Sequence, residues 1–239
     1  MTAPQGTAAG WRAEAERWER GGVSDAAQAC WERALELEPE DLPSLFGLGR
    51  IWLRKYRLPK ARRYFEQVLA RDPQWGGGEA ARALEKVRIE EVGVEQGFTA
   101  CRQMLRLDNF CAEAFAAMGT NYLWLGELEL AIGNFEDALN LGWEDRFRTL
   151  MAKGRAHAEL GDDAAAAECF AQAAEAEDAY RSWALYEHAA ALRRLGRSAE
   201  ALQLIRQAQA LDPADASIRW LEATLRTELA ESAGSSESR

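Results

Sequence analysis

Few residues in this chain of 239 could perform catalysis or hold a metal ion. Its two histidines, His157 and His188, are the side chains best suited to general acid–base work or metal ligation. A metal site would need further ligands with suitable geometry, and no cysteine or carboxylate is obviously placed to supply them. Both histidines fall at positions that helix packing requires. We therefore predict core or partly buried histidines and no metal site.

The cysteines also favour a structural role. The four are Cys30, Cys101, Cys111 and Cys169. No two of them have the Cys-x-x-Cys spacing of redox and zinc motifs. Cys30, Cys101 and Cys169 lie in helical patterns as small apolar residues, whereas Cys111 lies at a boundary between two patterns. We predict neither a disulfide nor a metal site from them.

Other catalytic patterns are equally weak. The run Gly76-Gly77-Gly78 is not followed by the Lys-Ser/Thr pair of a phosphate-binding loop. Carboxylate neighbours such as Glu90 and Glu91 are typical of a charged helix face. No nucleophile is paired with a base in an interpretable way. The sequence therefore predicts a protein that is not an enzyme and has no cofactor.

The elements that would position a functional side chain are clearest in residues 112–145. Apolar residues recur at i, i+3, i+4 and i+7 from Phe115 to Tyr122, and at i, i+4 and i+7 from Ala131 to Ala138. Gly126 lies between the two patterns, where a helix C-terminus often needs a left-handed residue. The segment is therefore predicted to be a helical hairpin.

This hairpin pattern recurs along the chain. The small residue early in the second helix is found at Ala27, Ala61, Gly97, Ala131, Ala166 and Ala201, at intervals of 34, 36, 34, 35 and 35. The residue four positions later is Trp31, Phe65, Cys101, Phe135, Phe170 and Ile205. Self-similarity at a fixed period is the signature of stacked repeats, each of which buries its apolar face against its neighbours.

The alternation of small and bulky residues resembles the tetratricopeptide repeat (TPR), a helical hairpin of 34 residues. The resemblance implies an all-α fold, a right-handed α-solenoid of antiparallel helix hairpins over residues 10–231. The expected units are 8–41, 42–75, 78–111, 112–145, 147–180 and 182–215, and a cap helix is expected at 216–231. Residues 1–9 and the polar tail 232–239 are expected to be disordered.

The unit at 78–111 is degenerate. Its first helix is rich in charged residues, and its second helix opens with Gly97. One interpretation is a divergent unit that packs less well. The other is a hinge between an arm of two repeats and an arm of three, since few packing contacts lower local stability.

Charge and hydropathy restrict the partners. The net charge of −10 argues against nucleic acid, because phosphate binding needs a basic surface. No run approaches the roughly 18 apolar residues of a membrane-spanning helix, so we expect no direct membrane insertion. The N-terminus lacks the basic and apolar regions of a secretory signal, which favours a cytoplasmic protein. A periplasmic location is expected if a signal peptide has been removed.

By the same resemblance, first helices line a concave groove at positions 2, 5, 6, 9, 12 and 13 of each unit. These positions collect ten basic and seven acidic residues, in a chain whose net charge is −10. A groove of opposite sign to the chain favours an acidic or amphipathic partner segment. Aromatic side chains at these positions suggest binding hot spots. The candidate groove residues are Arg50, Arg54, Arg82, Lys86, Trp124, Arg148, Met151, Arg155, Trp183, Tyr186, Arg193 and Arg194.

We therefore expect a non-enzymatic protein–protein interaction module, an adaptor or assembly factor that holds a partner peptide or helix in its groove. Two alternatives stay open. One is a self-assembling structural scaffold, in which copies of the chain form a homo-oligomer. The other is a component of a secretion, pilus or envelope-assembly apparatus.

Overall fold

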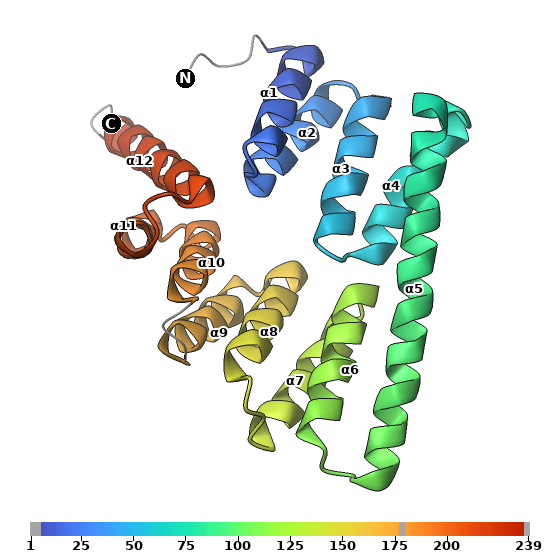
Figure 1. Ribbon diagram of the computed structural model, residues 1–239. Coiled ribbons are helices and arrows are strands. Elements are labelled where there is room, and N and C mark those ends of the chain that lie inside the picture. The colour runs from blue at the N-terminus through green and yellow to red at the C-terminus, as the bar shows by residue number, and fades with distance from the viewer. Residues whose placement is uncertain (1–5, 177–179, 237–239) are drawn as a thin grey trace. The chain divides into compact units, whose positions relative to one another are not determined.

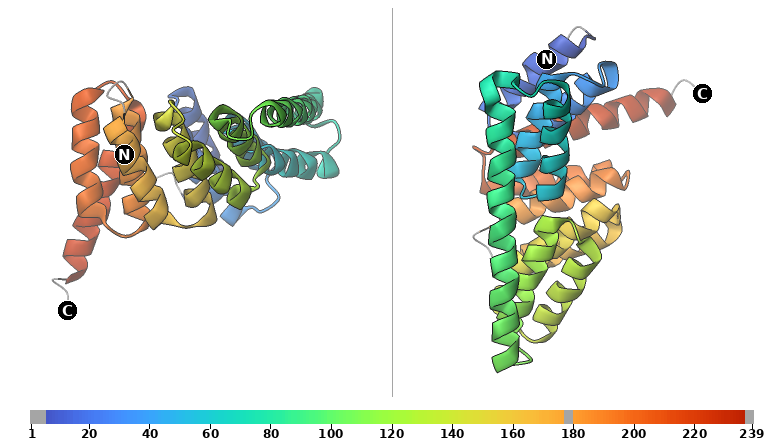
Figure 2. Two further views of the ribbon diagram at one scale, coloured as in Figure 1. Left: turned by 90° about the horizontal axis from the view of Figure 1, so that it is seen from below. Right: turned by 90° about the vertical axis from the view of Figure 1, so that its right-hand side faces the viewer.

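The computed structural model describes residues 6–176 and 180–236, which form twelve helices and no strand (Figure 1, Figure 2). From α1 to α4 and from α7 to α12, each helix packs on the next one in the chain, so the predicted all-α solenoid of TPR-like hairpins is confirmed. The chain divides into two compact units. The first runs to Phe98 and includes Trp124–Gly126, and the second holds Thr99–Leu123 and the chain from Glu127 onward.

The first unit contains two hairpins. They are α1 (Ala8–Arg20) with α2 (Ser24–Leu37), and α3 (Leu42–Arg54) with α4 (Leu58–Arg71). The helix α5 (Trp75–Leu107) follows. Asp41 caps α3 by accepting a hydrogen bond from the Ser44 amide at 3.0 Å, and it also pairs with Arg12 of α1. One carboxylate thus starts a helix and ties two neighbouring hairpins together.

The second unit contains three hairpins and a final helix. They are α6 (Ala112–Leu125) with α7 (Leu128–Asn140), α8 (Arg146–Leu160) with α9 (Asp163–Ala176), and α10 (Arg181–Arg194) with α11 (Ser198–Leu211). The final helix is α12 (Ala216–Ser236). A continuous core runs from Phe147 of α8 to Leu225 of α12, and α12 covers its end with three buried side chains, including Ile218.

Within the hairpins, a glycine of the first helix lies against an aromatic ring of the second. A Cβ atom on Gly154 would lie 2.7 Å from Cε1 of Phe170, and one on Gly119 would lie 2.7 Å from Cδ1 of Phe135. Real side chains essentially never approach so closely. The recurring glycine of the first helix and the recurring aromatic residue of the second therefore determine how closely the two helices of a hairpin pack.

The hairpin predicted at 78–111 is wrong. From residue 79 to Leu107 this segment is one unbroken helix, the greater part of α5, and Figures 1 and 2 show no turn back within it. Inside α5, the non-helical backbone angles are confined to Gly76, Gly77 and Gly78. The boundary between the two compact units falls within α5, after Phe98. It lies in the segment that the sequence marks as a candidate hinge.

The residue at the turn position explains why α5 does not fold back. In the hairpins this position has a positive φ, at Gly22, Tyr56, Gly126, Gly161 and Gly196. In the third unit it is Val92, and a β-branched residue pays a steric penalty in the left-handed region. The recurring packing residues of a hairpin are also absent from this unit. Glu85 occupies the position of the small residue, and Cys101 occupies the position that is aromatic in most other units. Nothing therefore stabilises a turn there.

The two ends also differ from expectation. Thr7 caps α1 by accepting a hydrogen bond from the Gly10 amide at 3.2 Å, so helix begins at Ala8, inside the segment expected to be disordered. The last helix continues beyond the expected residue 231 to Ser236. The predicted disorder of 1–5 and 237–239 falls outside the described residues. No helix among those described is long and apolar enough to cross a bilayer.

Candidate partner-binding surface

The predicted groove residues lie on first helices of the hairpins and on α5. Arg50 and Arg54 are on α3, Arg82 and Lys86 on α5, Trp124 on α6, Arg148, Met151 and Arg155 on α8, and Trp183, Tyr186, Arg193 and Arg194 on α10. Their surroundings separate them into three groups: cations held in ion pairs, side chains buried in the core, and side chains left accessible.

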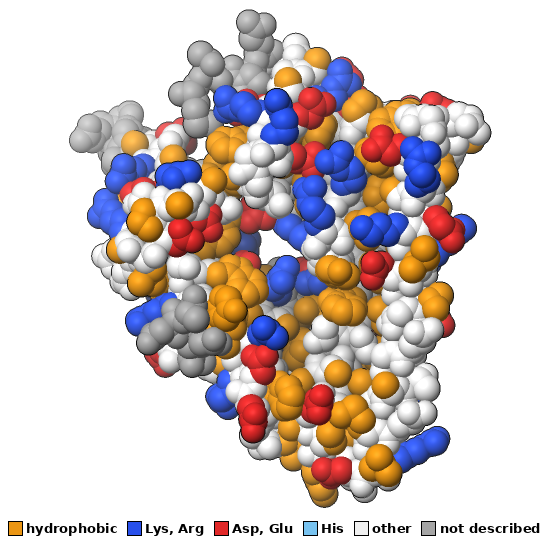
Figure 3. Space-filling view, in the orientation of Figure 1, with side chains coloured by type: hydrophobic (Ala, Val, Ile, Leu, Met, Phe, Trp, Pro, Cys, Tyr) orange, Lys and Arg blue, Asp and Glu red, His pale blue; other side chains and the backbone are white. Residues whose placement is uncertain are grey.

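Basic side chains of the first unit are held by internal partners. Arg50 and Arg54 both pair with Glu19 of α1, at 3.1 and 2.9 Å. Figure 3 shows basic side chains gathered over α3. Arg82 donates to the Gly77 carbonyl oxygen at 3.1 Å, whereas Lys86 is exposed on α5. The two α3 arginines thus cross-link α3 to α1, which lowers the net positive charge they offer to a partner.

Two cations of the second unit are also cross-links. Arg193 pairs with Glu228 of α12 at 2.6 Å, and Arg194 pairs with Asp163 of α9 at 2.5 Å. Each joins a hairpin to the next element in the solenoid. Because such a partner is already in place, an incoming carboxylate would have to compete with it.

Arg148 and Arg155 of α8 are more available. Arg148 is 75% exposed and lies 3.6 Å from Asp145, whose other carboxylate oxygen caps α8 through the Arg148 amide. Arg155 is partly buried and forms no ion pair within the described residues. The two arginines are seven residues apart, so they lie on one face of α8.

Two predicted groove residues belong to the core. Met151 is 1% exposed and Tyr186 is 7% exposed, and both pack in the same apolar cluster with Phe147. The expectation that these two side chains face a groove is therefore not met. Both occupy position 5 of a first helix, and in these two units that position is buried.

The predicted tryptophans are partly accessible. Trp183 is 40% exposed, its ring lies against Phe147 with centroids 5.9 Å apart, and its indole N–H donates to Glu187 at 3.3 Å. Trp124 is half-buried and stacks on Tyr56 with ring centroids 5.1 Å apart. The stack covers one face of the indole, so Trp124 offers a partner less surface than expected.

Sequence reasoning missed a pocket between α6 and α8. It has a volume of about 280 Å³ and is lined by Glu113, Ala116, Ala117, Thr120, Phe135, Trp143, Asp145, Arg148 and Thr149. Its space comes from the small side chains of Ala116, Ala117 and Thr120 at groove positions 5, 6 and 9. Small residues at groove positions are the sequence signal for such a pocket, whereas the predicted groove residues are charged or large and apolar. A pocket can take a side chain that a flat groove cannot.

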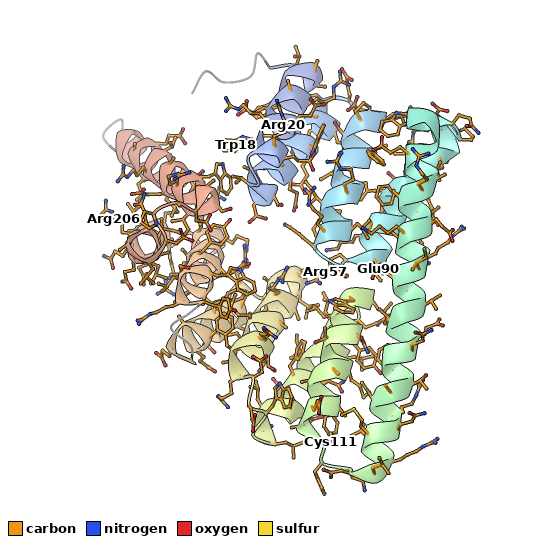
Figure 4. All side chains as sticks on the ribbon, viewed as in Figure 1. Trp18, Arg20, Arg57, Glu90, Cys111 and Arg206 are labelled. Atoms are coloured by element: carbon orange, nitrogen blue, oxygen red, sulfur yellow. The ribbon has the colours of Figure 1, made fainter. Side chains whose placement is uncertain are left out.

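Burial is the main cause of the pKa shifts of three cysteines and of His188. Burial, with a smaller contribution from Glu14, raises the pKa of the Cys30 thiol to about 11. Burial also raises the pKa values of Cys101 and Cys169, so these thiols are poor nucleophiles at neutral pH. Burial and the nearby Arg197 lower the pKa of His188. Cys111 is partly buried beside the turn from α5 to α6 (Figure 4). Among the described residues, no group of three or more His, Cys, Asp and Glu side chains could hold a metal.

Comparison with known structures supports the fold. A chain of the APC/C hetero-tetramer Cut9-Hcn1 is 13% identical, with a TM-score of 0.50 over 92% of this chain. The match spans only 42% of that chain. YrrB, described as a TPR protein with an unusual peptide-binding site, is 18% identical, with a TM-score of 0.45 and coverage of 92% and 93% of the two chains. TTC0263, a thermophilic TPR protein of Thermus thermophilus, is 22% identical, with a TM-score of 0.40 and coverage of 92% and 100%.

Two family models match this chain, whereas comparison with curated proteins finds no significant match. One tetratricopeptide repeat model matches residues 13–74, and a second matches 147–180 and 184–215. These segments cover most of the first two hairpins and of the last two, and together they make up slightly more than half of the sequence. With the recurring glycine–aromatic contacts, these matches show that the chain belongs to the tetratricopeptide repeat family.

Proposed function

We propose that this chain is a non-catalytic adaptor or assembly factor that holds an acidic segment of another protein along α6, α8 and α10 of its second unit. Proteins of the TPR family mediate protein–protein interactions and are typically non-catalytic. The finer assignment of a surface and a partner chemistry rests on the accessible side chains of these three helices.

The face of α8 supplies the observation that carries this proposal. Arg148 and Arg155 lie on one face, two helical turns apart, and Arg155 has no ion-pair partner among the described residues. A partly buried, unpaired guanidinium favours a carboxylate ligand, because charge-assisted bonds to a carboxylate are strong and often bidentate. An acidic segment would satisfy this donor.

The pocket beside Arg148 adds a second element of recognition. Its small side chains, Ala116, Ala117 and Thr120, leave room for one side chain of a bound segment. Exposed Trp183 on α10 offers an aromatic surface, and tryptophan and arginine are common hot-spot residues. An acidic residue followed by an apolar or aromatic one therefore fits this surface better than a purely acidic run.

The test is an affinity capture from the source lysate with wild type beside an Arg148→Glu/Arg155→Glu double variant, read by quantitative mass spectrometry. Both side chains are at least partly accessible, so the double variant should keep its helical circular dichroism spectrum. A captured protein is then divided into overlapping peptides, and their affinities are measured for both forms. Reversing two charges should weaken an acidic peptide at least about tenfold, which corresponds to roughly 1.4 kcal/mol.

The matched control is Arg206→Glu. Arg206 is exposed on the second helix α11 (Figure 4) and forms no ion pair within the described residues. This variant makes the same substitution once, on a helix that the proposal does not use. Equal weakening by Arg206→Glu would indicate a non-specific charge effect, and unchanged binding by the double variant would exclude the α8 face.

The alternative of a self-assembling scaffold is favoured by a different observation. Large apolar side chains are exposed on α5, away from the face that packs in the first unit's core. These side chains belong to a different helix from the α8 arginines, so one chain can carry both activities.

A further inference from the structure

The outer face of α5 exposes an unusual amount of apolar surface. Leu107 is 91% exposed, Phe110 just after the helix is 75% exposed, and Ile89 is 64% exposed. These are the most exposed large apolar side chains among the described residues. Leu107 is more exposed than Leu37, Leu141 and Leu211, which occupy the same position in three of the hairpins.

The exposed residues belong to a regular pattern, which we call the outer seam. It consists of Ile89, Gly93, Gln96, Ala100, Gln103 and Leu107. Their spacing alternates between four and three residues, the heptad spacing with which one helix packs along another. All six are uncharged and exposed. The buried side chains Val87, Val94 and Cys101 lie on the opposite side of α5.

The outer seam is complementary to itself when its direction is reversed. Reversal about residue 98 places Ile89 of one copy opposite Leu107 of another, so apolar ends meet apolar ends. It also places Gly93 opposite Gln103, and Gln96 opposite Ala100, so each long side chain meets a small one. Such reciprocal matching is what a two-fold symmetric interface requires. The seam spans about 27 Å of helix, at 1.5 Å per residue.

The charges at the two ends are also complementary. Lys86 lies one helical turn before Ile89, and Asp108 directly follows Leu107. In the reversed alignment, Lys86 of one copy lies near Asp108 of the other. Lys86 forms no ion pair within the described residues, so its ammonium group is available for that contact. A partner of unrelated sequence would have to reproduce both the size matching and the charge matching, whereas a second copy already has them.

We propose that two copies of this chain associate through the outer seams of α5, packed antiparallel about a two-fold axis near residue 98. The contact is a single helix pair, so its area is at the small end of specific interfaces. The association is therefore weak and depends on protein concentration.

The first test is sedimentation equilibrium of the full chain from micromolar to near-millimolar concentration. The wild-type mass should rise from one chain toward two, and an Ile89→Glu/Leu107→Glu variant should dimerise at least tenfold more weakly. Leu211→Glu is the matched control, because Leu211 is an exposed leucine, 55% accessible, at the end of another helix, α11. Circular dichroism checks that all variants keep their helices. A wild type that stays monomeric, or a dimer that the α5 variant does not weaken, overturns the proposal.

The second test reports direction. Single variants Ile89→Cys and Leu107→Cys are made with Cys111→Ser, because Cys111 is the one natural cysteine that is not buried. In antiparallel pairing, mild oxidation of a mixture should link the Ile89→Cys chain to the Leu107→Cys chain, and each variant alone should stay unlinked. Efficient linking of each variant to itself would show parallel pairing and contradict the proposed register.

Discussion

The contact between one glycine and one aromatic ring determines how closely two helices pack in a hairpin. Gly154 is buried against Phe170, whose ring has no exposed surface. Interiors are packed as densely as organic crystals, so an added methyl group must displace something. The same contact recurs at Gly119 with Phe135 and at Gly49 with Phe65. The glycine that recurs at this position of the repeat is thus explained by the close approach of an aromatic ring.

Gly154→Ala should therefore lower the free energy of unfolding, although alanine favours helix. The new Cβ would lie 2.7 Å from Phe170, and overpacking of this kind costs about 1–3 kcal/mol. The gain in helix propensity, roughly 1 kcal/mol, offsets only part of that cost. We expect a net loss of about 1 kcal/mol, measured by urea denaturation.

Gly133→Ala is the control for helix propensity. Gly133 lies on α7 and is exposed, and a methyl group added to it would have no atom of another residue within 4 Å beyond its own helical turn. This substitution should raise stability by about 0.5–1 kcal/mol. If both alanine variants were stabilised equally, Phe170 would not restrict the approach of α8 and α9.

The candidate site could be predicted only in part from residue types. The repeat period placed Arg148 and Arg155 on one helix, and both are accessible to some degree. It could not show that Met151 and Tyr186 are buried, because that depends on how neighbouring first helices pack. It also could not show that Glu19 holds Arg50 and Arg54, since those contacts join different repeats.

At the scale of elements, the helix positions follow closely from the sequence period, and α5 is the exception. The sequence pattern predicts a hairpin at 78–111 because Gly97 occupies the position of the small residue found early in the second helix of the other units. A hairpin also needs a residue that accepts a positive φ at the turn, and Val92 does not do so readily. The repeat period therefore predicts helical structure in residues 78–111. Whether two helices form a hairpin there depends on the turn residue, Val92.

Hydrogen exchange distinguishes a continuous α5 from a hairpin. In a continuous helix, the amides of Glu95, Gln96 and Gly97 each donate to a carbonyl four residues earlier. In a hairpin they would begin a second helix, where the first amides have no such acceptor. We expect them to exchange at least about tenfold more slowly than Leu128–Leu130, the first residues of α7, when measured by NMR.

The start of α7 is a suitable reference because it follows a turn and has no side-chain cap. Equal exchange rates in the two segments would contradict an unbroken α5. Equal rates would also remove the outer seam, because its residues would no longer share one face of a single helix.

At the scale of the whole molecule, each hairpin is stabilised by its neighbours in the chain. Within the second unit, the ion pairs Arg194 with Asp163 and Arg193 with Glu228 each join a hairpin to the element that follows it. The apolar core is likewise shared from α8 to α12. A solenoid of this kind has nearest-neighbour energetics, so the loss of one element should destabilise the adjacent ones most.

Removal of α12 tests this directly. Deleting residues 216–239 removes Ile218, Leu221 and Leu225, each at most 1% exposed, and uncovers the core beneath them. Burial of three such side chains contributes about 4–8 kcal/mol as an upper estimate. We expect α10 and α11 to lose most of their hydrogen-exchange protection, α8 and α9 to lose less, and α1–α4 to keep theirs. Deletion of 237–239 alone is the control and should change no protection. A uniform loss across all helices would show that the chain unfolds as one cooperative body, because nearest-neighbour coupling confines the loss to the elements beside the missing cap.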